Sequence, residues 1–406
     1  MESHFVQVII SVCVLLFAAK LMAELFVRIR LPIVLGELVA GMLVGPFAIG
    51  AFLMFQGEHL VVLTEEVKIL GEIGAIVILF MAGLEMTPKE FVRGGKASFT
   101  VGTLGVIVPF FVGFFVFQIF GFDAFQAMLV ATALTATSIA ISVQVLSEFG
   151  KLKTPEARLI IGAAVIDDIL AIAVLSVVTS IGGSGMDGIE ITNVVFTIFK
   201  VLAFFAAMAI AAIFLVPRIV NSKMWKASGS IEGIVTAAFF GTAGLAAWIG
   251  LSPILGSFVV GMALSTTKVF ERVEHYVGKL GLIFAPLFFA IIGAQVDFRG
   301  INSEVAVIGA VIIGVAIVTK LVGCGLPALA FLKNRAQSRR VGIAMISRGE
   351  VGLIVAGIGL SSGVLMPNIY TTIVIMVAVT SLITPIWLKL EYKKDVQQNP
   401  TPQNTT

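Results

Sequence analysis

The stretch Leu31-Pro-Ile-Val-Leu-Gly-Glu-Leu-Val-Ala-Gly-Met42 returns later in the chain as Leu251-Ser-Pro-Ile-Leu-Gly-Ser-Phe-Val-Val-Gly-Met262. The two stretches are identical at six of twelve aligned positions, including both glycines. A weaker match relates Phe80–Met86 to Phe289–Val296, with one inserted residue. Short glycine-rich helices can resemble one another by chance, but two matches in the same order indicate an internal repeat.

The composition around this repeat is that of a polytopic membrane protein. Of 406 residues, 58% are hydrophobic and 13% charged, with a mean hydropathy of +1.08. Soluble domains are about 45–50% apolar and about 25% charged. We therefore predict an all-α membrane protein whose thirteen spans lie near 5–27, 32–50, 68–87, 97–119, 125–147, 157–181, 193–216, 230–249, 254–267, 277–296, 304–332, 341–360 and 369–389.

The span order gives the repeat a direction. The second span matches the ninth and the third matches the tenth, and an offset of seven spans makes the two copies cross the membrane in opposite directions. The pattern is six helices, a linker helix and six inverted helices. Inverted repeats are typical of secondary transporters, which bind their substrate near the midplane between the copies.

Basic residues predict the orientation. One set of loops carries 21 Lys and Arg residues, whereas the opposite loops carry only Lys68 and Arg299. The positive-inside rule then places the N-terminus outside the cell membrane and the C-terminus in the cytoplasm. Residues 395–406 are polar and contain two prolines, so we expect a disordered tail there. No basic stripe outside the spans favours nucleic acid as a partner.

The most informative ionisable residues are Asp167 and Asp168, which stand side by side in the sixth predicted span. They lie ten residues from its expected cytoplasmic end, at a depth of about 15 Å. Charges at that depth cost about 2.5–3.5 kcal/mol each on insertion scales. Neighbouring residues point about 100° apart on a helix. We therefore expect one aspartate to face a partner and the other a hydrated cavity.

Lys320 lies at similar depth in the eleventh predicted span and is too far from either end to reach water readily. One carboxylate of the aspartate pair is its natural partner. Glu37, by contrast, is close to a predicted span end. It could be solvated there or could line an inner funnel.

Two further segments place polar residues inside spans. Thr135-Ala-Thr137-Ser138 could unwind the fifth span and offer oxygens to a cation, or its hydroxyls could bond back to their own helix. Ser347-Arg348-Gly349-Glu350 carries opposite charges two residues apart, which do not face each other on a regular helix. A broken helix would let each charge find its own partner, and those partners could serve helix assembly alone.

Taken together, these residues resemble the monovalent cation/proton antiporter-2 family, the NapA-like sodium/proton antiporters and their Kef relatives. The tandem aspartate and the lack of a following nucleotide-binding domain resemble the sodium/proton type more than the Kef type. The resemblance covers almost the whole membrane portion and is carried by Gly36–Pro46, Thr135–Ser138, Ala164–Asp168, Pro286–Gly293 with Asp297, Lys320, and Arg348–Val351.

The resemblance implies a homodimer in which residues 1–394 form one transporter unit. A dimerisation domain would include the helices near 5–67 and 230–276, and a mobile core the helices near 68–181 and 277–389. The fifth and twelfth spans would be discontinuous and would cross each other. The core would then carry the ion site past the dimerisation domain, as an elevator does.

The resemblance also assigns roles to single residues. Asp168 would bind the cation and carry a proton, and Asp167 would pair with Lys320, itself a proton carrier. Thr137 and Ser138 would add oxygens near the crossing. Arg348 and Glu350 would support the core.

We therefore expect an electrogenic antiporter that exchanges Na⁺ or Li⁺ for protons and needs no cofactor. A potassium/proton antiporter is the first alternative, and a sodium-coupled solute symporter of similar fold is the second. A channel, a sensor or an enzyme lacks a supporting motif in this sequence. Cys13 and Cys324 lie in separate apolar runs and predict neither a disulfide nor a metal site.

Overall fold

The computed structural model describes residues 2–55, 58–184, 191–297, 299 and 301–398. The described chain is helical apart from one pair of two-residue antiparallel strands, β1 (Met54–Phe55) and β2 (Glu58–His59). Within these residues, ten helices are long and apolar enough to cross a membrane, and four apolar helices are shorter. The all-α membrane class is confirmed, while the count of thirteen spans stays a prediction.

The helices follow the order of the predicted spans, with two of those spans divided. Their bounds are α1 (Glu2–Arg28), α2 (Ile33–Val44), the short η1 (Ile49–Phe52), α3 (Glu65–Leu84), α4 (Pro88–Ile119), α5 (Ala124–Ala133), α6 (Ile139–Glu148), α7 (Pro155–Ser184), α8 (Ile191–Val220), α9 (Ser230–Trp248), α10 (Pro253–Leu264), α11 (Phe270–Ala294), α12 (Ser303–Lys320), the π-helical turn η3 (Leu321–Gly325), α13 (Leu326–Leu332), α14 (Arg335–Ala344), α15 (Glu350–Ser361) and α16 (Pro367–Gln398).

Several helix ends differ from the sequence prediction, and two of them have a clear cause in the sequence. Helix α4 begins nine residues before the predicted span because Thr87 and Glu90 form a capping box around Pro88. Helix α16 continues through Gln398, so the expected disorder from residue 395 is wrong for its first four residues. No helix breaker occurs there until Pro400. The rest of the expected tail lies outside the described residues.

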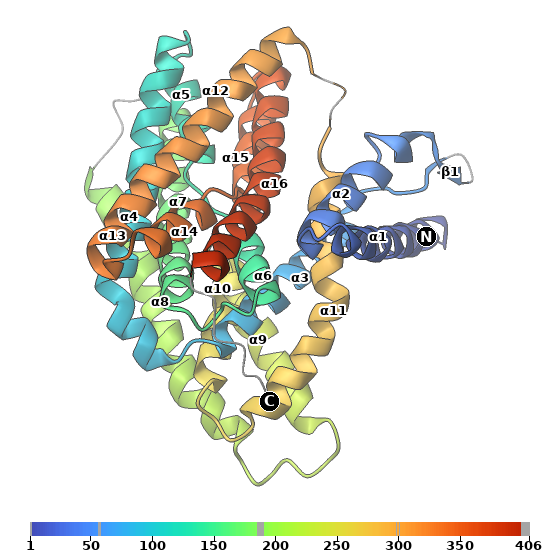
Figure 1. Cartoon of the computed structure of the whole chain (residues 1–406), viewed down its shortest axis with the longest axis vertical. Helices are drawn as coiled ribbons and strands as arrows, with labels where there is room; N and C mark the ends of the chain where they lie inside the picture. Colours follow the sequence, from blue (N-terminus) through green and yellow to red (C-terminus); the bar gives the residue numbers. More distant parts are fainter. Residues whose placement is uncertain (1, 56–57, 185–190, 298, 300, 399–406) are drawn as a thin grey trace.

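The helices pack in two groups, and Figure 1 shows α1, α2 and α11 of one group to the right of α12, α15 and α16 of the other. We call α1, α2, α3, α9, α10 and α11 the panel, and α4–α7 with α12–α16 the core bundle. Helix α8 contacts α10 of the panel and α7 of the core bundle, so it joins the two groups. The sequence placed the helices near 68–87 and 277–296 in the core, yet α3 and α11 pack mainly with α2 and α10.

Glycines explain why α2 and α11 lie in one group. A Cβ atom added at Gly41 would lie 1.9 Å from the carbonyl oxygen of Ala290, and one added at Gly293 would lie 2.1 Å from that of Leu38. Real side-chain atoms do not approach so closely. The two backbones therefore meet only because both positions lack a side chain.

Helices α3 and α10 make the same kind of contact. A Cβ atom at Gly261 would lie 2.2 Å from the carbonyl oxygen of Phe80, and one at Gly83 would lie 2.2 Å from that of Phe258. Gly261, Gly83 and Phe258 are the repeat counterparts of Gly41, Gly293 and Leu38, and Phe80 is the counterpart of Phe289, the neighbour of Ala290. The matched stretches of sequence thus take part in matched backbone contacts, which supports the proposed inverted repeat.

The fifth and twelfth predicted spans are both broken. The chain leaves the helix between Ala133 and Ile139 and again between Ala344 and Glu350. The two breaks contact each other directly, since the amide of Ser138 donates to the carbonyl oxygen of Ser347 at 2.8 Å. The prediction of two crossed, discontinuous helices is confirmed.

Candidate cation and proton site

A buried ion pair lies beside this crossing. The Nζ atom of Lys320, on α12, donates to Oδ1 of Asp167, on α7, at 2.6 Å, and both side chains have 0% exposure. Each residue was placed at mid-depth from its position in the sequence, and the structure brings them together. Either charge alone would be costly in this environment, so each stabilises the other.

The second oxygen of Asp167 binds the unwound backbone. The amide of Thr137 donates to Oδ2 of Asp167 at 3.0 Å. That amide belongs to the break before α6, where no intrahelical acceptor is available. Asp167 therefore joins α7, α12 and the α5–α6 break through one carboxylate.

Hydroxyl groups line the crossing itself. Thr137 donates its hydroxyl to the carbonyl oxygen of Met345 at 3.4 Å, and Ser142 donates to that of Ala344 at 2.5 Å. The hydroxyl of Ser138 is buried and has no hydrogen-bond partner among the described residues. A Cβ atom at Gly349 would lie 2.8 Å from that of Ser138, so a glycine is required opposite it. The sequence prediction of oxygens at Thr137 and Ser138 agrees with this placement.

Arg348 fills the other side of the crossing. Its guanidinium is fully buried and donates to the carbonyl oxygens of Thr135 at 3.3 Å, Ala136 at 3.2 Å and Ala316 at 3.1 Å. The first two carbonyls lie in the break just beyond α5, next to a helix end that carries partial negative charge. Arg348 therefore compensates the interrupted end of α5, a role more specific than the general core support expected from sequence.

Asp168 is also buried, with 2% exposure, and follows Asp167 on α7. One helical step turns its side chain about 100° away from the Asp167–Lys320 pair. The two carboxylates are thus neighbours that point in different directions, and the hydrated cavity expected beside one of them stays a prediction. The side chain of Glu350, the remaining expected site residue, lies outside the described residues, although its backbone begins α15.

Two residues that the sequence did not single out border the ion pair. A Cβ atom at Gly105, on α4, would lie 2.7 Å from Sγ of Cys324 and 3.2 Å from Oδ1 of Asp167. Cys324 lies in the π-helical turn that follows Lys320, and its thiol is fully buried. Single-turn π-helices occur often at functional sites. Nothing in the sequence distinguished this glycine from many others in apolar spans.

Two other acidic residues lie apart from the ion pair. Asp297 binds Arg299 through two side-chain hydrogen bonds in the loop between α11 and α12, and this arginine holds its pKa below the ordinary value. Glu37 is buried on α2, so the expectation of a solvated side chain is wrong. Its Oε2 atom has no hydrogen-bond partner among the described residues.

The site at the crossing therefore contains two buried acids, Asp167 and Asp168, and two buried bases, Lys320 and Arg348, all within the core bundle. Oxygen atoms of carboxylates and hydroxyls are the ligands that hard cations such as Na⁺ prefer. Among the described residues, no group of three or more His, Cys, Asp or Glu side chains is arranged to hold a metal ion tightly.

Comparison with known proteins identifies the family. A family model described as "Sodium/hydrogen exchanger, transmembrane" matches residues 12–392. The chain belongs to the sodium/hydrogen exchanger family. It is 35% identical to the high-affinity Na⁺/H⁺ antiporter NhaS3 of Synechocystis, over 97% of this chain and 93% of that protein. It is 36% identical to the Na⁺/H⁺-K⁺ antiporter GerN of Bacillus cereus, over 94% and 95%.

A solved structure supports the fold of this exchanger. The sodium proton antiporter MjNhaP1 of Methanocaldococcus jannaschii superimposes with a TM-score of 0.70 over 97% of this chain and 98% of that one, at 17% identity. The recognition of a cation/proton antiporter family from sequence is confirmed, while a special kinship to Kef proteins stays a prediction. The relatives named here are transporters, so the expectation that the exchanger is no enzyme is also confirmed.

Proposed function

We propose that this exchanger is an electrogenic Na⁺(Li⁺)/H⁺ antiporter. The observation that carries the proposal is the fully buried Asp167–Lys320 pair, with Asp168 as the next residue, at the crossing of two broken helices. Asp168 and Asp167 would bind the cation with oxygens from Thr137 and Ser138. No cofactor takes part, because both exchanged ions bind to these side chains.

Counting charges supports electrogenic exchange. With Lys320 charged, Asp168 protonated and Arg348 charged, the four buried groups sum to +1. Na⁺ between two ionised carboxylates, with Lys320 neutral and Arg348 charged, gives zero. Both states keep the buried charge small, which limits the cost of moving it through a low-dielectric region. One Na⁺ is then exchanged for two protons, from Asp168 and Lys320, and the cycle moves one net charge.

The two helix groups support a division of labour in which the core bundle moves the site and the panel stays in place. Only a few contacts join the groups directly, chiefly α6 with α2 and α3, and α16 with α2. The panel would also form the interface of the homodimer, which is the role expected for the dimerisation domain from the sequence. Such motion is a hinge or shear between two bodies that are each tightly packed.

The test is proton flux in everted vesicles after addition of Na⁺, Li⁺ or K⁺. The parent should respond to Na⁺ and Li⁺, and Asp168→Asn should abolish the response while the protein still folds. Asp123→Asn is the matched control, because Asp123 is an exposed N-cap of α5 and asparagine caps equally well. Normal exchange in Asp168→Asn would reject the site.

Potassium is the second candidate cation. GerN, at 36% identity, carries the name of an Na⁺/H⁺-K⁺ antiporter. The site offers no feature that excludes K⁺ by geometry. A proton response to K⁺ alone, without one to Na⁺, would favour this alternative.

A further inference from the structure

Helix α2 begins without a cap of its own. Pro32 stands at its N-cap position and makes no side-chain hydrogen bond to the first turn. A helix N-terminus leaves amide groups without intrahelical acceptors, and a carboxylate satisfies them best. The missing acceptor is supplied from the other helix group.

Glu148, the last residue of α6, provides that acceptor. Its Oε2 atom accepts from the amide of Ile33 at 2.9 Å, and Oε1 accepts from the amide of Val34 at 3.0 Å. Both oxygens are used, and hydrogen bonds to an ionised acceptor are about twice as strong as neutral ones. Since α6 belongs to the core bundle and α2 to the panel, this cap joins the two groups.

An ion pair follows only five residues later in the chain. Nζ of Lys153, in the loop between α6 and α7, lies 3.4 Å from Oε2 of Glu85, at the end of α3. Lys153 is largely exposed and Glu85 mostly buried, so this pair is weaker than the Glu148 cap. It nevertheless connects the same segment of the core bundle to the panel a second time.

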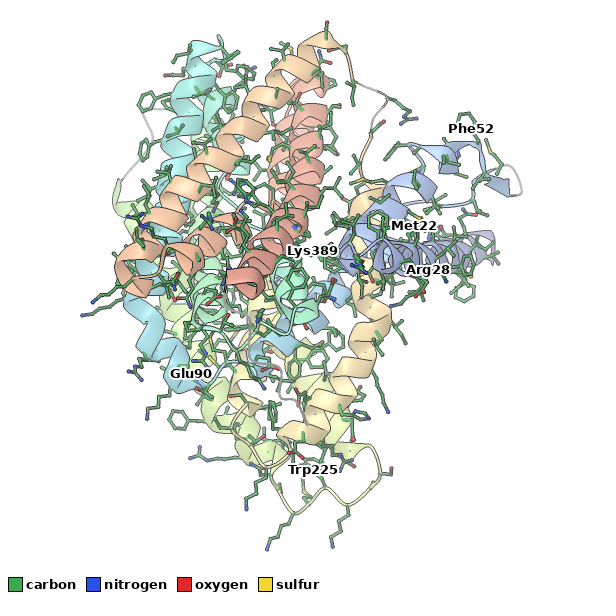
Figure 2. The ribbon with its side chains drawn as sticks, in the orientation of Figure 1. Met22, Arg28, Phe52, Glu90, Trp225 and Lys389 are labelled. Atoms are coloured by element: carbon green, nitrogen blue, oxygen red, sulfur yellow. The ribbon has the colours of Figure 1, made fainter. Side chains whose placement is uncertain are left out.

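Both contacts are flanked in the sequence by basic loop residues, among them Arg30 and Lys151. Lys389, labelled in Figure 2 on the last turns of α16, is close enough to be attracted by Glu148 and repelled by Arg30. The Glu148 cap reinforces the direct contact of α6 with α2, and the Lys153–Glu85 pair joins the loop after α6 to the end of α3. A relative movement of the two groups has to break them.

We propose that Glu148, assisted by Lys153, is a positioning residue that holds the core bundle against the panel and thereby sets the balance between the two access states. This inference rests on the proposed transport cycle and adds a regulatory contact outside the ion site. Glu148 favours the arrangement described here, and its release accompanies the change to the opposite arrangement. An interaction shifts the equilibrium between two states only if its free energy differs between them. The Glu148 contact meets this condition because it is present in one state and absent in the other.

The first test is hydrogen exchange of the purified full-length protein. Glu148→Ala should accelerate exchange of the amides of Ile33 and Val34, because their acceptor is gone, and Glu148→Gln should have a smaller effect. Glu90→Gln is the matched control, since Glu90 caps its own helix within the core bundle. Unchanged exchange at Ile33 and Val34 in Glu148→Ala would overturn the proposal. This measurement does not depend on transport.

The second test compares the apparent KM for Na⁺ on the two sides of the membrane, in right-side-out and everted vesicles. Glu148→Ala should change the ratio of the two KM values about tenfold, since the two states bind cation from opposite sides. General damage to the fold would lower the maximal rate without changing that ratio. An unchanged ratio in a folded, active Glu148→Ala protein would overturn the proposal.

The third test reverses the charges of the Lys153–Glu85 pair and leaves Glu148 unchanged. Lys153→Glu should shift the KM ratio in the same direction as Glu148→Ala, and adding Glu85→Lys should restore it. Failure of the double variant to restore the ratio, with both proteins folded, would reject the role of this pair. If the parent exchanged no cation at all, the proposed function would fail, while hydrogen exchange would still decide whether Glu148 joins the groups.

Discussion

At the scale of single residues, Asp167 has the most constrained environment in the site. One oxygen accepts from Lys320 and the other from the amide of Thr137. A cation that approaches these carboxylates competes with the ammonium group for the same oxygen. In the proposed cycle, cation binding and release of a proton from Lys320 would therefore be coupled through one atom, Oδ1 of Asp167.

This coupling predicts the behaviour of Lys320→Gln. Transport should continue but become electrically silent, because one of the two proton carriers is gone. The folded state should lose about 3–5 kcal/mol, since Asp167 keeps a buried charge without its partner. Thermal unfolding and sodium-driven currents in proteoliposomes measure the two effects. Parental stability together with parental currents would contradict both the pairing and the proton role.

Arg348 gives a second prediction at this scale. Arg348→Lys keeps the charge but loses the planar fork that reaches three carbonyl oxygens. We expect a loss of about 1–3 kcal/mol per carbonyl left unsatisfied. The control is Arg339→Lys, because Arg339 is half exposed where it pairs with Glu391 and should change stability by about 0.5 kcal/mol or less. Equal thermal unfolding of the two variants would count against the capping role of Arg348.

At the scale of elements, the site was predictable where depth along a span decides the outcome. Depth predicted that Lys320 pairs with one of the two aspartates, because neither charge could reach water, and the family resemblance pointed to Asp167. The hydroxyls of Thr137 and Ser138 marked the break in the helix. The sequence did not predict which carbonyls Arg348 would reach. In a regular helix the residue spacing fixes the direction of each side chain, but in a broken helix it does not.

The packing of α3 and α11 with the panel escaped prediction for a different reason. It depends on backbone contacts between segments that are far apart in the sequence, and glycines mark such contacts without hydrophobic periodicity. The sequence could not decide between the two alternatives for Glu37. Distance along a span allowed a solvated side chain or one that lines an inner funnel, whereas packing between helices buries it.

The glycine contacts make a prediction about α2 and α10. Gly41→Ala and Gly261→Ala should each destabilise the protein by about 1–3 kcal/mol or more, because the new methyl group would overlap a carbonyl oxygen of the facing helix. Gly244→Ala in α9 is the control: no atom lies within 4 Å of the new Cβ, and alanine is the better helix former. Similar melting temperatures for all three variants would show that the close contacts do not matter.

At the scale of the whole molecule, ion binding, proton release and stability are linked. Na⁺ bound only to the folded protein stabilises it by about 2.7 kcal/mol at a hundredfold excess over the dissociation constant. Protons compete for the same carboxylates, so this stabilisation should grow as pH rises and disappear as pH falls. The pH dependence of this stabilisation therefore gives the number of protons that each Na⁺ displaces.

The count gives the final prediction. The number of protons released on binding equals the slope of the logarithm of the apparent affinity against pH. Where both Asp168 and Lys320 hold protons in the absence of Na⁺, the parent should show a slope near two. Lys320→Gln has lost one of these groups and should show a slope near one, and Asp168→Asn should show little stabilisation by Na⁺. Thermal unfolding over a series of Na⁺ concentrations and pH values supplies these slopes, with choline as the control cation. A slope near one in the parent would remove Lys320 from the proton count and make the exchange electroneutral.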